Sequence, residues 1–175
     1  MFWILLAIIA IILVIVMAVV VTALSQKSSA NVEMVAARLA QLQTTVTDRQ
    51  TDIGNTNLAN TNSTLGLNLT QLNNEIKDIL VSDGKNPKKL NNAIVTKEAQ
   101  NTKDLAATLD NAKLNALFDS TYASAMTYQL DTTLSTIHQM EKNKNGPKMT
   151  TFLTDADKDL SQARDSFARY DDTAL

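Results

Sequence analysis

The sequence contains no cysteine and only one histidine among its 175 residues. The absence of cysteine excludes a lipoprotein anchor, and it is compatible with either redox compartment. A single histidine without a nucleophile motif gives no basis for a hydrolase, and a metal site needs more ligands than one imidazole. The net charge of −2 gives no reason to expect a nucleic-acid partner. We therefore expect a non-enzymatic protein with no cofactor, no metal and no evident small-molecule substrate.

Glycine, proline and aromatic residues are also scarce. There are 4 glycines and 2 prolines, and aromatic residues make up 5% of the chain. Few helix breakers together with many Ala, Leu, Lys, Gln and Asp residues favour helix over sheet. The chain is at the same time rich in Thr and Asn, which lower helix propensity. The sequence thus predicts an all-α protein whose helices are held by packing.

Charge is absent from the start of the chain. Residues 1–24 form one apolar run, and no charged residue occurs before Lys27. About 20 apolar residues are enough to cross a hydrocarbon core of roughly 30 Å as a helix. No basic residue precedes the run, and it is longer than the usual core of a cleaved signal peptide, which remains the alternative. We expect a transmembrane signal-anchor helix at 1–24 and a single-pass protein of the bacterial cytoplasmic membrane.

The side of the membrane on which the rest of the chain lies stays open. Lys27 and Arg38 follow the apolar run, and the positive-inside rule then favours a cytoplasmic domain. The Thr- and Asn-rich composition without cysteine suits an extracytoplasmic domain instead.

Residues 25–175 fit one helical-bundle domain by length. Turn signals at 82–87 and 145–147 divide them into helices of about 28–81, 87–143 and 148–171. The first two would each extend about 80 Å, so we expect a long antiparallel hairpin or coiled coil with a shorter third helix. The Gly- and Asn-rich stretch 54–64 is a weak point, which we interpret as a kink. If it is a loop, a compact four- or five-helix bundle is the alternative.

Apolar residues in all three predicted helices recur at alternating spacings of three and four, which is the pattern of a helix-packing seam. The seam residues on which this prediction depends are Leu39, Leu42, Val46, Leu130, Ile137, Leu153, Leu160 and Phe167. In a lone hairpin part of this seam would be open. Self-association, or a protein partner, is therefore expected.

Lysines cluster at both predicted turns. In the hairpin, Lys142, Lys144 and Lys148 would return to the membrane beside Lys27. Basic groups at an anionic leaflet contribute about 1 kcal/mol each, so our hypothesis is that these four contact the membrane surface, although lysines that merely solubilise a loop are the simpler interpretation. The lysines of 85–89 would lie at the distal tip, as a docking point for an acidic partner.

The segment 163–170, with the residues Ala-Arg…Phe-Ala-Arg-Tyr, resembles the end of bacterial LemA-type membrane proteins. That family shares an apolar span near the N-terminus and a bundle of long helices. Its Asp-Leu-Ile-Pro-like stretch after the span is missing, since no proline precedes Pro87, and the chain is not assigned to it. Phage inner-membrane spanins are similar in architecture alone, with an anchor followed by a coiled coil.

These features predict a membrane-anchored helical bundle that acts through protein–protein contacts, as an envelope scaffold, assembly factor or accessory subunit. A sensory or ligand-binding bundle with a pocket between helices is the second possibility, and it would need a separate signalling partner. A spanin-like lysis or fusion factor is the third.

Overall fold

The computed structural model of the chain describes residues 30–143 and 145–170. Within these ranges there are five α-helices and no strand. The first, here called the leading helix, is helical over residues 30–49. It is followed by η1 (Gln50–Asp52), α2 (Thr56–Ser82), α3 (Asn92–Leu114), α4 (Phe118–Glu141) and α5 (Pro147–Ala168). For these residues the predicted all-α helical bundle is confirmed.

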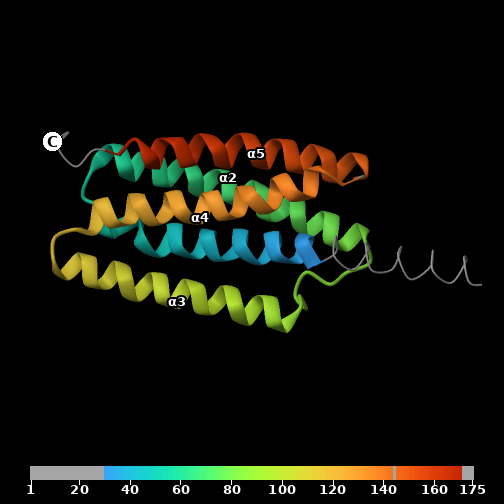
Figure 1. The fold of residues 1–175 in the computed structure, drawn as a ribbon, viewed down its shortest axis with the longest axis horizontal. Coiled ribbons are helices and arrows are strands. Elements are labelled where there is room, and N and C mark those ends of the chain that lie inside the picture. The colour runs from blue at the N-terminus through green and yellow to red at the C-terminus, as the bar shows by residue number, and fades with distance from the viewer. Residues whose placement is uncertain (1–29, 144, 171–175) are drawn as a thin grey trace, which may run out of the picture.

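Successive helices run in opposite directions along one long axis (Figure 1). Residue 30, the connection between α2 and α3 and the connection between α4 and α5 lie at one end of the bundle, which we call the near end. The turns at 50–55 and 115–117, together with residue 170, lie at the opposite end, the far end. The near end is therefore the end from which the chain continues toward residues 1–29.

Four of the five helices share one apolar core. The leading helix, α2, α4 and α5 supply nearly all of its buried residues, and α5 packs along both α4 and α2. In α3 the buried residues are Leu109, Ala112 and Glu98, one of which is charged. The helix α3 therefore lies beside a four-helix core as a peripheral fifth helix (Figure 1).

The predicted helix 28–81 is wrong, because the chain reverses at 50–55. The break precedes most of the stretch 54–64, which is helical from residue 56 onward. Asn55 caps α2, since its side-chain oxygen accepts two first-turn N–H groups at 2.9 and 3.1 Å. Asp119 of α4 accepts the backbone N–H groups of residues 54 and 55 at 3.0 and 2.7 Å. These bonds satisfy the groups that the reversal takes out of helical pairing.

The predicted helix 87–143 is wrong as well, because a tight turn at 115–117 separates α3 from α4. Ala116 adopts the left-handed conformation with φ 58°. Its N–H bonds to the carbonyl of Lys113 at 3.3 Å, and the N–H of Leu117 bonds to the carbonyl of Ala112 at 2.9 Å. This is a Schellman motif, whose left-handed position is usually glycine. The two extra reversals replace the long hairpin with the compact five-helix arrangement.

The helix α2 ends in the same motif with the usual residue. Gly84 has φ 73°, its N–H bonds to the carbonyl of Val81 at 3.0 Å, and the N–H of Lys85 bonds to the carbonyl of Leu80 at 2.8 Å. At the next connection Pro147 opens α5, where a missing N–H costs nothing.

The expected transmembrane helix at 1–24 lies outside the described residues. Among the residues that the structure describes, none of the helices combines the length and the apolar character needed to cross a bilayer.

Candidate functional site

A polar groove lies between α3 and α4, with the leading helix at its base. Its volume is about 300 Å³. The helix α4 packs far more extensively on α5 than on α3. The residues that line the groove are Arg38, Glu98, Asn101, Asp104, Leu105, Thr108, Ala125, Tyr128, Gln129 and Thr132. Most of them carry hydrogen-bonding groups, and the aromatic ring of Tyr128 is largely exposed.

An ion pair between Arg38 and Glu98 forms the floor of this groove. Arg38 Nε donates to Glu98 Oε1 at 3.2 Å, and the two side chains are only 15% and 8% exposed. Arg38 Nη1 also donates to the carbonyl oxygen of Thr132 at 3.0 Å and to Thr136 Oγ1 at 2.8 Å. Removing one partner of a buried pair costs about 3–5 kcal/mol. The pair therefore fixes α3 against both the leading helix and α4.

The Glu98 carboxylate at the floor of the groove has a partner on each of its oxygens. Glu98 Oε2 accepts a long hydrogen bond from Asn101 Nδ2 at 3.4 Å, so both carboxylate oxygens are engaged. His138 lies elsewhere, paired with Asp157 of α5 at 2.6 Å between Nε2 and Oδ1. Within residues 30–143 and 145–170, no cluster of three His, Cys, Asp or Glu side chains is suited to hold a metal ion. Amide, hydroxyl and phenol groups line the groove together with the carboxylate of Asp104.

The near end is held together by Glu33 of the leading helix. Its carboxylate pairs with Lys85 Nζ and accepts the backbone N–H of Asn91 at 2.8 Å. The hydrogen bond from Lys85, opposed by partial burial, lowers the pKa of Glu33 below its usual range. One carboxylate thus ties both ends of the α2–α3 connection to the start of the described chain.

The structure describes two of the four lysines that were predicted to contact the membrane surface. Lys142 and Lys148 are exposed at the near end, on either side of the α4–α5 connection. Lys27 and Lys144 lie outside the described residues. The expectation that the lysines of 85–89 occupy a distal tip is wrong, because the reversal at 50–55 returns α2 to the near end (Figure 1).

Two aspartates at the far end form ion pairs with basic side chains. Asp52 accepts from Lys113 Nζ at 2.5 Å and from Arg49 at 3.4 Å, and Arg49 also pairs with Asp110 at 2.6 Å. The hydrogen bond from Lys113, with help from Arg49, lowers the pKa of Asp52. These pairs join the end of the leading helix to the last turn of α3.

Two leucines stand out from the α3–α4 turn itself. Leu114 is 84% exposed and Leu117 is 54% exposed, although both belong to a turn fixed by backbone hydrogen bonds. Both lie at the far end of the bundle, and we call them the turn leucines.

A buried polar cluster joins three helices near the far end. The Tyr122 hydroxyl donates to Asn62 Oδ1, while Asn62 Nδ2 donates to the carbonyl of Val46 at 3.0 Å and to Gln50 Oε1 at 2.5 Å. Burial raises the pKa of Tyr122. Its ring stacks on Phe118 with centroids 5.6 Å apart. Since Asn62 is fully buried with its side chain engaged, this cluster is structural.

The predicted seam residues all lie in the core. Each is 5% exposed or less: Leu39, Leu42, Val46, Leu130, Ile137, Leu153, Leu160 and Phe167. Helices of the same chain cover them, so the open seam that suggested self-association is not present in the described residues.

Sequence reasoning missed the groove. Arg38 stands next to the seam residue Leu39, and a charged residue beside a seam was the available signal. Glu98 carried no signal, because nothing local shows that a glutamate in a poorly patterned helix is buried. Comparisons of the chain with models of protein families, with curated proteins and with solved structures returned no match.

Proposed function

We propose that this chain is a single-span membrane protein whose helical bundle acts through protein–protein contacts, as an envelope scaffold, assembly factor or accessory subunit. The observation that supports this most directly is the pair of turn leucines. Isolated exposed apolar residues are ordinary. Two leucines together on one turn, with charged neighbours, have the composition of a small interface centre with a polar rim.

The turn that carries these leucines is fixed by hydrogen bonds and ion pairs. Two backbone hydrogen bonds close it, and the ion pairs of Asp110 and Lys113 brace the last turn of α3. A preformed contact surface loses little conformational entropy when a partner binds. Its position at the far end also suits a partner that approaches from the end opposite to residue 30 (Figure 1).

Site-specific photo-crosslinking in cells tests this proposal. A photoreactive amino acid replaces Leu114 or Leu117 in the full chain, and Leu67, a leucine of α2 that is 74% exposed, serves as the matched control. We expect one discrete adduct at the two turn positions and none at Leu67. An adduct of twice the mass of the chain would identify a second copy as the partner. No adduct at the turn, or the same adducts at all three positions, would contradict the proposal.

The groove between α3 and α4 favours ligand binding as the second candidate function. A volume of about 300 Å³ with convergent amide and hydroxyl groups is at the lower limit for a small-molecule site. A thermal-shift screen of polar metabolites on the full chain tests it. A shift that disappears in Gln129→Ala, a lining variant that leaves the Arg38–Glu98 pair intact, would support it. No shift with any compound would count against it.

A further inference from the structure

The two ends of the bundle carry opposite charge. At the near end, the described segments 30–33, 83–91, 141–143 and 145–148 hold five lysines, namely Lys85, Lys88, Lys89, Lys142 and Lys148, and three acidic residues, namely Glu33, Asp83 and Glu141. At the far end, segments 48–55, 110–119 and 168–170 hold four acidic residues, namely Asp48, Asp52, Asp110 and Asp119, and three basic ones, Arg49, Lys113 and Arg169. The difference is invisible in the sequence order, because the folded topology creates it.

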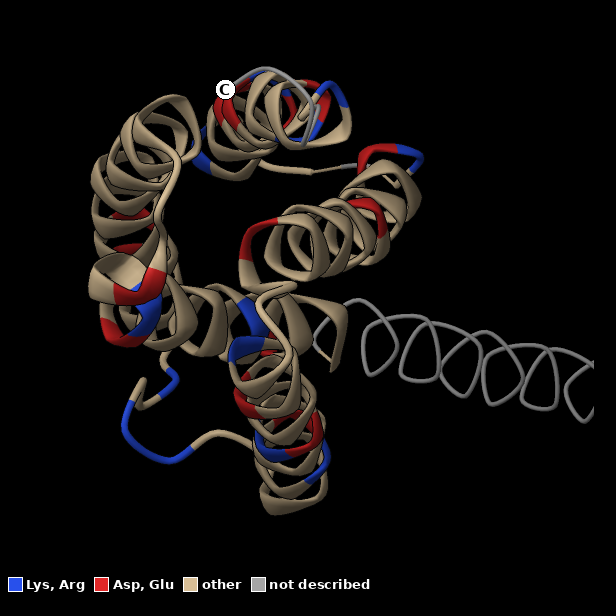
Figure 2. Ribbon diagram, turned by 90° about the vertical axis from the view of Figure 1, so that its left-hand side faces the viewer, with Lys and Arg blue, Asp and Glu red and all other residues tan. Residues whose placement is uncertain are grey.

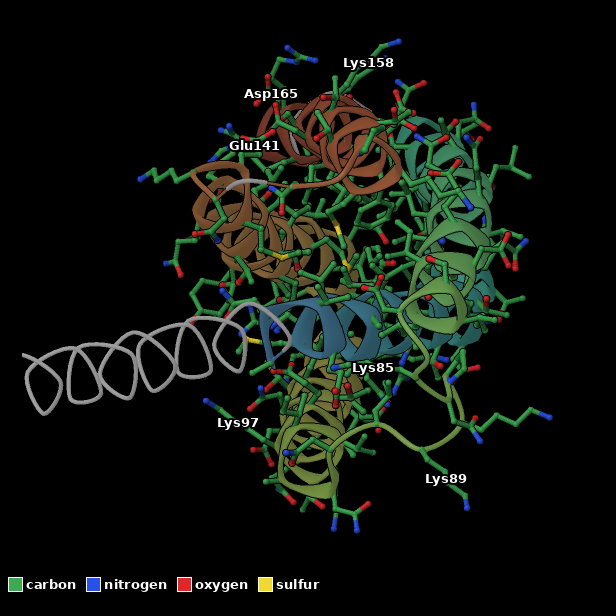
Figure 3. The ribbon with its side chains drawn as sticks, turned by 90° about the vertical axis from the view of Figure 1, so that its right-hand side faces the viewer. Lys85, Lys89, Lys97, Glu141, Lys158 and Asp165 are labelled. Carbon is green, nitrogen blue, oxygen red and sulfur yellow. The ribbon has the colours of Figure 1, made fainter. Side chains whose placement is uncertain are left out.

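The near-end lysines are exposed, apart from the one that Glu33 engages. Lys88, Lys89, Lys142 and Lys148 are all exposed. The connection between α2 and α3 stands clear of the helices, with much of its length basic (Figure 2). Viewed onto the near end, Lys85 lies beside the leading helix and Lys89 extends away from the bundle (Figure 3). The connections are therefore free to present positive charge outward.

The near end is also where the apolar run joins the bundle. Residue 30 lies there, and only residues 25–29 separate it from the run 1–24. Five residues reach at most about 17 Å when fully extended. If the run spans the bilayer, as the proposed function holds, both connections lie within reach of the lipid headgroups.

We propose that the near end of the bundle rests on anionic lipid headgroups, which Lys88 and Lys89 of one connection and Lys142 and Lys148 of the other contact directly. The occupant is a membrane surface because the basic connections and the apolar run share one end, and the charge of an anionic leaflet complements theirs. Each lysine at such a surface favours contact by about five-fold. The contact would hold the bundle upright and direct the turn leucines away from the membrane.

The test uses the full chain in nanodiscs of anionic phosphatidylglycerol or of zwitterionic phosphatidylcholine. The absence of native cysteine allows one fluorophore at Asn86→Cys in the α2–α3 connection, and a second protein carries it at Asn115→Cys at the far end. A nitroxide attached to lipid headgroups quenches the fluorophore only at contact range. We expect quenching at position 86 in the anionic discs, at least about five-fold weaker quenching there in zwitterionic discs or in high salt, which is the contribution of a single lysine, and no quenching at position 115.

Variants separate this contact from general charge effects. Lys88→Gln, Lys89→Gln and Lys142→Gln together should reduce quenching at position 86 most of the way to the zwitterionic level, since only Lys148 of the four lysines remains. The matched variant removes the same charge from the middle and far end of the bundle, with Lys103→Gln, Lys158→Gln and Arg169→Gln, and should leave quenching unchanged.

Two results would overturn the proposal in distinguishable ways. Equal quenching at position 86 in both lipids, in a chain that co-elutes with the discs, would refute the lysine contact and leave the membrane anchor in place. A chain that does not co-elute with either disc would refute both the contact and the single-span function on which it rests.

Discussion

Ala116→Gly should stabilise the protein, which is the opposite of what this substitution does inside a helix. Ala116 is held at φ 58° in the turn between α3 and α4. A left-handed backbone costs an L-residue about 1–2 kcal/mol, and glycine avoids this strain. Glycine also gives the unfolded chain more freedom, which lowers stability by about 0.4–1 kcal/mol. The net gain is therefore about 0.5–1 kcal/mol, or a rise in Tm of about 1–4 °C for a chain of this size.

The matched control is Ala107→Gly, at an exposed position inside α3. There the backbone is helical, so glycine should lower stability by about 1 kcal/mol and Tm by about 2–4 °C. Thermal unfolding of the full chain in detergent, followed by circular dichroism, gives both values. If the two variants lowered Tm equally, the left-handed turn at residue 116, and with it the division between α3 and α4, would be refuted.

Three further substitutions test other parts of the bundle by the same unfolding assay. Tyr122→Phe should lower the free energy of unfolding by about 1–3 kcal/mol, because it leaves the buried Asn62 oxygen without its donor. The double variant with Asn62→Leu should lose less than the sum of the losses of the two single variants. Strict additivity would argue against the hydrogen bond. Gly66→Ala should fail to gain the roughly 1 kcal/mol that alanine offers in a helix, since its Cβ would lie 3.2 Å from Val46 Cγ1; a full gain would mean that these helices are not in close contact. Because the pKa of Asp52 is lowered in the folded protein, its carboxylate adds stability at pH values above the ordinary pKa of an aspartate, and this stability is lost as the pH falls from about 5 through the folded-state pKa. Asp52→Asn should therefore flatten the fall of Tm in acid. An unchanged acid profile would exclude this contribution.

The residues that face the core were readable from sequence, because a helix repeats every 3.6 residues wherever it packs. Leu130 and Ile137 are buried in the compact bundle although the long hairpin is absent, and so are Leu153 and Leu160. The spacing reports which face of each helix is covered. It contains no information on which helix covers it.

The reversals were harder to read, for two different reasons. At 115–117 no glycine indicates a turn, because alanine occupies the left-handed position where glycine is expected. At 50–55 the sequence does weaken, but the decisive partner, Asp119, is more than 60 residues away. Asp119 stands in the first turn of α4, at a seam position where it interrupts the apolar spacing. A polar residue in a seam predicts that something polar meets it, and here that is the backbone of a distant turn.

The number of reversals decides what the two ends of the molecule can do. With one reversal fewer before α2 ends, the lysines of the α2–α3 connection would lie at the end remote from residue 30, and they would be suited to an acidic protein. With the observed reversal at 50–55 they lie beside Glu33 of the leading helix and share their end with Lys142 and Lys148. Asn55 and Asp119, which fix that reversal, are thus the residues that give the bundle a basic end at residue 30 and leave the exposed leucines at the other end.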